Sequence, residues 1–248
     1  MTARVLMYHS VSHDDEVGSP SPFRVSRSTF ARQLGHLRSR YHARTLDEGI
    51  VSTADDDVLL TFDDGYLDNY TVAFPLLQEF GLNAAIFVVA DFQRRRNWWD
   101  DALPTRNAPL LEPRHMREMA THGIEFGSHT LSHPVLSQLG DVALRNELAD
   151  SKHAVEDIVG RPVHHLAYPY GYVDERTKDA VRAAGYKAAF AVNSGPLRPT
   201  ADLFEIRRLL MGDSSNWLYI HSKMLGVEKM VRWAYWNCRR TIPSRLVA

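Results

Sequence analysis

The chain has 248 residues, a length that fits one large α/β domain with its own hydrophobic core. Its 29 basic and 30 acidic side chains give a formal net charge of −1, which argues against nucleic acid as a partner. The single cysteine, Cys238, excludes an internal disulfide and a metal site built from several thiolates.

Short apolar runs alternate with helical patterns along the chain. The predicted strands are residues 5–8, 58–62, 84–90, 124–126, 166–168 and 186–192. The predicted helices are one capped by Ser28, then 70–80, one that begins at Pro113, 141–159 and 174–184. Repeated strand–helix units favour one parallel α/β domain, either a barrel or an open sheet. In a barrel, the active site lies at the C-terminal ends of the strands.

The two ends of the chain lead to expectations about location. The apolar run 5–8 is too short for a signal-peptide core, and no stretch approaches the length of a membrane-spanning helix, so we expect a cytoplasmic protein.

We expect a barrel domain over residues 1–212 and a helical extension over 213–248. The aromatic and basic side chains of this extension leave two alternatives, a helix packed on the barrel or peripheral contact with a membrane.

The segment Thr-Phe-Asp-Asp-Gly over residues 61–65 ends the strongest predicted strand. The adjacent carboxylates of Asp63 and Asp64 repel each other unless a cation or a proton separates their roles. The alternative is a simple turn, because Asp-Gly is a common turn dipeptide.

His129 and His133 follow another predicted strand. Histidines four residues apart on a helical turn face the same way and can share one metal ion. With one carboxylate they make a three-ligand set that leaves positions open for water and substrate, while the second carboxylate stays available as a base. The alternative is a pair of surface histidines.

Two further segments contain aromatic residues. Ala-Tyr-Pro-Tyr-Gly over residues 167–171 follows a strand, and its proline and glycine predict an irregular backbone whose N–H groups can stabilise an oxyanion. A plain turn with packed aromatics is the alternative. Trp98 and Trp99 lie in a long loop, where they could stack on sugar rings or anchor the loop in the core.

Together, TFDDG, HTLSH and AYPYG, in this order and spacing, resemble the motifs of the NodB-type polysaccharide deacetylases, carbohydrate esterase family 4. The resemblance implies a single-domain distorted (β/α)7-type barrel and a divalent metal, usually Zn²⁺, with Co²⁺, Ni²⁺ or Mn²⁺ as alternatives. It implies Asp64, His129 and His133 as metal ligands and Asp63 as general base. It also implies that the backbone N–H of Tyr170 contributes to the oxyanion hole.

The sequence departs from the family pattern in two places. Ala167 stands where the third motif usually has arginine, and no late Leu-x-His segment supplies a general acid. The chain is most similar to the permuted subgroup that includes poly-N-acetylglucosamine deacetylases, in which an early Tyr-His pair is typical. This similarity implies His9 as general acid and Arg208 as the replacement arginine, with Arg207 as its rival. We also expect substrate contacts from Tyr8, Trp98, Trp99, Pro169 and Tyr170.

The resemblance therefore implies a metal-dependent hydrolase that removes N-acetyl groups from an amino-sugar glycan and releases acetate. The alternatives are hydrolysis of another amide or ester, such as a formamide or acetylated xylan, and a carbohydrate-binding barrel without turnover. The presence of Asp63 argues against the last, because binding alone needs no base. Chitin oligomers, poly-N-acetylglucosamine, peptidoglycan and lipid-linked saccharides all fit as substrates.

Overall fold

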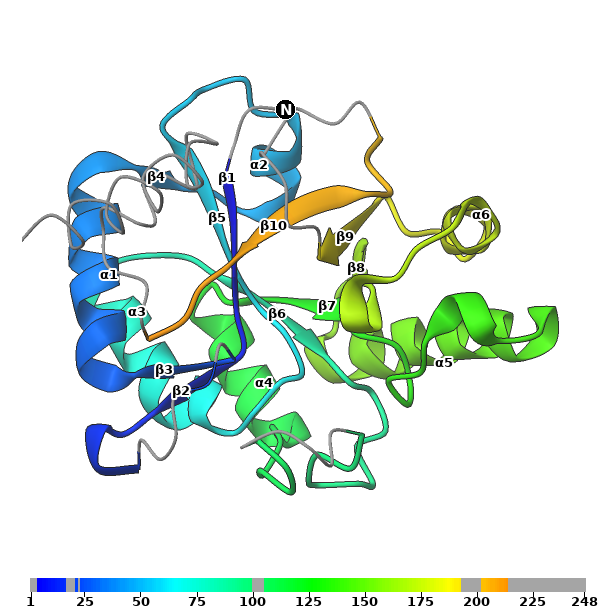
Figure 1. Ribbon diagram of the computed structural model, residues 1–248, viewed down its shortest axis with the longest axis horizontal. Coiled ribbons are helices and arrows are strands. Elements are labelled where there is room, and N and C mark those ends of the chain that lie inside the picture. Colours follow the sequence, from blue (N-terminus) through cyan, green and yellow to red (C-terminus); the bar gives the residue numbers. More distant parts are fainter. Residues whose placement is uncertain (1–3, 17–20, 22, 100–104, 193–201, 214–248) are drawn as a thin grey trace, which may run out of the picture.

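The computed structural model describes residues 4–16, 21, 23–99, 105–192 and 202–213. Within them, seven parallel strands form a closed barrel, because β1 pairs with both β10 and β5 (Figure 1). The barrel strands are β1 (Arg4–Tyr8), β5 (Asp57–Phe62), β6 (Ala85–Val88), β7 (Glu125–Ser128), β8 (His165–Ala167), β9 (Ala188–Val192) and β10 (Ile206–Leu210). Three short strands lie outside the ring: β4 (His42–Ala43) on β5, and β2 (Ser10–Ser12) paired with β3 (Arg24–Ser26).

Helices surround the barrel (Figure 1). They are α1 (Arg27–Arg40), α2 (Leu46–Val51), α3 (Phe74–Phe80), α4 (Pro113–Thr121), α5 (Asp141–Val159) and α6 (Glu175–Ala183), with short helical turns η1 (Asp14–Glu16), η2 (Asn69–Ala73), η3 (Leu136–Gln138) and η4 (Pro169–Gly171). None of the helices in the described ranges is long and apolar enough to cross a membrane. The predicted extension over 213–248 lies, from residue 214 onward, outside the described residues.

The predicted barrel is confirmed, and most predicted elements fall within a few residues of the observed ones. The helix over 141–159 has the predicted bounds, and its buried face includes Leu144 and Leu148. Two details of the prediction are wrong. Ser26, rather than Ser28, caps α1, since its hydroxyl accepts a hydrogen bond from the backbone N–H of Thr29. The strand β10 and the helix α2 were not among the predicted elements.

Strand alternation divides the core into two parts. The inner part fills the barrel and is closed at the N-terminal end of the strands by α2, whose Leu46 and Ile50 pack among the inward-facing strand residues. A Cβ added to Gly49 of α2 would lie only 2.2 Å from a Leu59 methyl group, so this close contact between helix and strand requires glycine. The larger outer part packs the barrel against the surrounding helices. Among the described residues, the inner core thus closes the N-terminal end of the barrel, and a cavity lies at the C-terminal end.

Glu125 links the closed end of the barrel to α2. Its carboxylate accepts a hydrogen bond of 3.0 Å from the backbone N–H of Leu46, and burial raises the pKa of Glu125 to about 7. Between the ordinary glutamate pKa of about 4.3 and this value, the folded protein keeps a proton that the unfolded chain has lost. Stability should therefore be highest at the acidic end of this window and fall as the pH rises through 7.

Glu125→Gln should remove this pH dependence while keeping an oxygen acceptor for Leu46. Urea unfolding between pH 5 and pH 8 measures it: the wild type should lose up to about 1.4 kcal/mol per pH unit more than the variant. Glu79→Gln, on the exposed side of α3, is the matched control and should follow the wild type. Parallel curves for the wild type and Glu125→Gln would contradict the prediction.

Candidate metal centre and active site

Three buried side chains meet at the C-terminal end of the barrel. Asp64 follows β5, and His129 and His133 follow β7. The Nε2 atoms of His129 and His133 lie 3.5 Å and 3.4 Å from the same Asp64 oxygen, Oδ1. Ligands at about 2.0–2.2 Å around a tetrahedral Zn²⁺ stand roughly 3.3 Å apart, so these separations fit one shared metal ion.

The state of the ligands also fits a metal. The Nδ1–H of His129 donates a 2.8 Å hydrogen bond to the carbonyl oxygen of Ala167, which leaves the Nε2 lone pair facing Asp64. Burial lowers the pKa of His129 to about 4, so the imidazole is neutral near pH 7. The pKa of Asp64 also lies below its usual value, because contacts with His133 outweigh the effect of burial. The site thus offers one anionic and at least one neutral ligand.

The loops that hold these ligands have an unusual backbone. Asp64, Thr130, His133 and Tyr170 all have positive φ, between 58° and 73°, although none is glycine. Positive φ in non-glycine residues costs energy and concentrates at functional sites. The expected helical turn between the two histidines is therefore wrong: residues 129–133 form an irregular loop that brings both Nε2 atoms to Asp64.

Asp63 forms a buried ion pair with Arg208. The guanidinium Nη1 and Nη2 donate to Oδ1 and Oδ2 of Asp63, each over 2.6 Å, and the Arg208 side chain is fully buried. Arg208 comes from β10 and lies over the rings of Phe87 and Phe190 at the top of the inner core. Burial tends to raise the pKa of Asp63, but the positive charge of Arg208 outweighs it and holds the pKa below its usual value. The carboxylate is therefore ionised at neutral pH.

The two candidate arginines on β10 differ in what they contact. Arg208 binds Asp63, and its Nη1 also lies 3.3 Å from the Thr61 hydroxyl. Arg207, the next residue, points away from this inner face because strand side chains alternate. The geometry thus gives Arg208 the position beside Asp63.

A cavity of about 260 Å³ opens beside the metal ligands. His9, at the end of β1, lines it, with its ring edge-on to Phe23 at 4.9 Å between ring centroids. The backbone carbonyl of His9 accepts a hydrogen bond from Asn69, which fixes the residue in place. Tyr170 also lines the cavity, and its ring lies edge-on to His133 at 4.7 Å.

Two of the expected substrate contacts lie away from the cavity. Met7 and His9 face the cavity, so strand alternation turns Tyr8 outward. Tyr8 is therefore fully buried between the barrel and α1, where its hydroxyl donates a hydrogen bond to Gln33. Pro169 is buried within the turn η4. Neither side chain lines the cavity, so the expectation that they contact substrate is corrected.

The two tryptophans differ in their contacts. Trp99 stacks on His133 with the ring centroids 4.7 Å apart, so it supports a metal ligand. Trp98 packs edge-on against Trp99 and lies under the guanidinium of Arg94. Neither ring is among the residues that line the cavity, and the expected sugar contacts of Trp98 and Trp99 stay a prediction.

Sequence reasoning missed several residues that line the cavity. Most of them come from loops and strand ends outside the three motifs, and they are Met7, Phe23, Tyr66, Thr105, Tyr168, Tyr172 and Val192. Tyr168 belongs to the Ala-Tyr-Pro-Tyr-Gly motif and Tyr172 follows it directly, so their aromatic rings within and beside this motif were a usable signal. The others come together only through the closure of the barrel.

The strands form a closed parallel barrel, and a buried Asp-His-His set lies at their C-terminal ends. This is the usual position of a barrel active site, so the protein is a barrel protein with a candidate catalytic metal centre. The chain belongs to the polysaccharide deacetylase family, whose model matches residues 51–189, more than half of its length. The predicted class of hydrolase is thereby confirmed.

Individual proteins agree with this placement. The YxkH protein of Bacillus subtilis, named as a polysaccharide deacetylase, is 29% identical over 88% of this chain and 76% of its own. A poly-β-1,6-N-acetyl-D-glucosamine N-deacetylase of Staphylococcus aureus is 24% identical over 78% of this chain and 69% of its own. The deacetylase PplD of Streptococcus pyogenes, solved with acetate, superposes with a TM-score of 0.77 at 23% identity, covering 90% of this chain and 98% of that one.

Proposed function

We propose that this protein is a metal-dependent N-deacetylase that acts on a glycan containing N-acetylated amino sugars. The observation that carries the proposal is an ionised carboxylate, Asp63, held by Arg208 directly beside a buried set of metal ligands. A protein that only binds sugars needs no such base. The activity named for the S. aureus relative supports poly-N-acetylglucosamine as the first substrate to test.

Asp64, His129 and His133 would hold the metal, and zinc is the first candidate because imidazole and carboxylate ligands at this spacing suit it. Co²⁺, Ni²⁺ and Mn²⁺ are the alternatives. When bound, such an ion lowers the pKa of water and polarises an acetyl carbonyl. Trp99, stacked on His133, shields this side of the site from solvent.

Asp63 accepts a proton from the attacking water, whose oxygen forms a bond to the acetyl carbon. Each Asp63 oxygen already accepts from Arg208, and each has a second lone pair for this proton. The backbone N–H of Tyr170 stabilises the oxyanion. His9 then donates a proton to the nitrogen as the C–N bond breaks, so acetate and a free amino sugar leave.

Acetate release tests the proposal. The zinc-loaded protein should release acetate from at least one of a panel of N-acetylglucosamine oligomers with β-1,4 and β-1,6 linkages, and from acetylated xylan only weakly. Release from xylan alone would favour the ester hydrolase. Oligomer binding without release from any substrate would favour a carbohydrate-binding barrel.

His9→Ala should lower kcat for the amide substrate by roughly 100-fold, because an amine leaves poorly without a proton. An activated acetate ester, such as an aryl acetate, has a leaving group that needs no proton and should be much less affected. Steady-state kinetics on both substrates measure the difference. His13→Ala, an exposed change nearby, is the control. Equal losses on amide and ester would contradict the role of His9 as acid.

A further inference from the structure

Exposed aromatic side chains gather at one place on the described surface. Among the residues that the structure describes, the exposed aromatic residues are Tyr170, 43% exposed, and Tyr172, 62% exposed. Both line the cavity beside the metal ligands. A large ring left in water at the edge of a cavity is a typical binding surface, because it can bury apolar area only when a ligand covers it.

The turn that carries Tyr172 is tightly packed. Gly171 has a φ of 73°, and a Cβ at this position would lie 2.4 Å from Cβ of Val192, so the turn packs directly on β9. At one end of the segment, the Tyr168 hydroxyl donates to the carbonyl oxygen of Phe204 over 2.9 Å. At the other, Asp174 accepts hydrogen bonds from the backbone N–H and hydroxyl of Thr177 and so caps α6.

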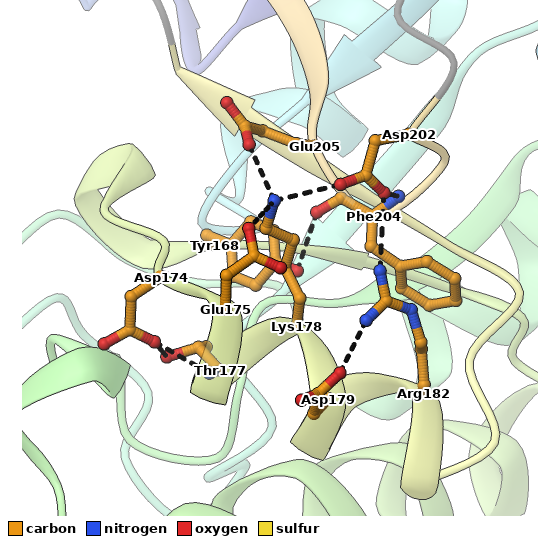
Figure 2. Close-up of polar contacts among 10 residues, drawn as sticks. All are labelled: Tyr168, Asp174, Glu175, Thr177, Lys178, Asp179, Arg182, Asp202, Phe204 and Glu205. Carbon is orange, nitrogen blue, oxygen red and sulfur yellow. Dashed lines mark hydrogen bonds and ion pairs between the residues drawn. The ribbon is translucent and has the colours of Figure 1, made fainter.

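A network of charges fixes α6 in turn, as Figure 2 shows. The ammonium of Lys178 lies 2.9 Å from Asp202, 3.0 Å from Glu205 and 2.7 Å from Glu175, and the lysine side chain is only 6% exposed. These pairs join α6 to residues 202–205, the same segment that binds Tyr168. Tyr172 therefore projects from a segment whose backbone is held at both ends, so little backbone freedom is lost when a ligand covers its ring.

The size of the cavity limits what lies inside it. Its volume of about 260 Å³ is at the lower end of the roughly 300–1,000 Å³ range of small-molecule pockets. A cavity of this volume can hold one sugar unit next to the metal ligands. The neighbouring units of a glycan chain must then lie outside the cavity, over its rim, where Tyr172 is exposed.

We propose that Tyr172 is a platform on which the sugar ring next to the one being deacetylated stacks, so that the enzyme favours oligomers over single amino sugars. The inference rests on the proposed function. The apolar C–H face of a pyranose ring covers the tyrosine ring, and this burial stabilises the bound oligomer. Within the described residues, the Tyr172 side chain makes no hydrogen bond or ring contact that would compete with this role.

Chain-length dependence of binding tests this role. For wild-type protein, the KM of an N-acetylglucosamine tetramer should be lower than that of the monomer. Tyr172→Ala should raise the KM of the tetramer about three- to tenfold, the scale of one aromatic stacking contact, with little change in kcat. The KM of the monomer should stay the same. Tyr172→Phe and Tyr172→Trp should keep tight tetramer binding, because they keep the ring.

Val142→Ala, which changes an exposed apolar residue of α5 outside the cavity lining, is the matched control and should behave as wild type. An unchanged tetramer KM in Tyr172→Ala, or an equal rise for monomer and tetramer, would overturn the proposal. Loss of tetramer binding in Tyr172→Phe would show that the hydroxyl acts, which also overturns stacking. Calorimetry measures the affinities of the monomer and the tetramer without any turnover, and the same outcomes are expected for these affinities as for KM. Stacking on Tyr172 can therefore fail or hold independently of the proposed deacetylation.

Discussion

His129→Ala and His133→Ala should each abolish detectable deacetylation and reduce the bound metal from about one equivalent to a small fraction. Each substitution removes one of three protein ligands, and a site with two ligands holds a divalent ion far more weakly. Both imidazoles lie within 3.5 Å of the same Asp64 oxygen, so neither can be replaced by the other. Elemental analysis of protein purified without chelator measures the metal content.

Two controls separate loss of the metal from loss of the fold. His153→Ala changes an exposed histidine of α5 and should keep full metal content and activity. Circular dichroism of the His129 and His133 variants should show wild-type helix and strand content. Full metal content and activity in both variants would show that the metal site lies elsewhere.

The sequence was sufficient to predict that the candidate metal ligands lie close together. Asp64 and His129 each follow a buried strand, and parallel strands of one barrel end at the same edge. Their proximity follows from the strand positions alone, without knowledge of the loops. The path from His129 to His133 did not follow in the same way, because positive φ at Thr130 and His133 is rare outside glycine and has no clear sequence signal.

The direction of single side chains on strands was harder to predict. A shift of one residue in strand phase turns a side chain from the inside of a barrel to the outside. This phase decides that Arg208 rather than Arg207 meets Asp63, and that Tyr8 packs against α1 rather than the substrate. The strand that carries Arg208 was itself not predicted, so its phase could not be assigned from the sequence.

Asp63→Asn should lower kcat by roughly 100-fold or more while the metal stays bound, because an amide cannot accept the proton from water. It should also destabilise the fold. The amide NH₂ of asparagine would face the guanidinium of Arg208, so one of the two hydrogen bonds is lost and a buried positive charge is left without its anion. Removing one partner of a buried ion pair costs about 3–5 kcal/mol in the free energy of unfolding.

A second variant separates the two effects. In Asp63→Asn combined with Arg208→Met, the buried charge is gone, and the methionine can pack on the rings of Phe87 and Phe190. The double variant should recover much of the lost stability in urea unfolding but none of the lost kcat. If it regained wild-type turnover, Asp63 would serve only to neutralise Arg208, and another group would have to be the base. Loss of turnover with recovered stability assigns the chemistry to the Asp63 carboxylate itself.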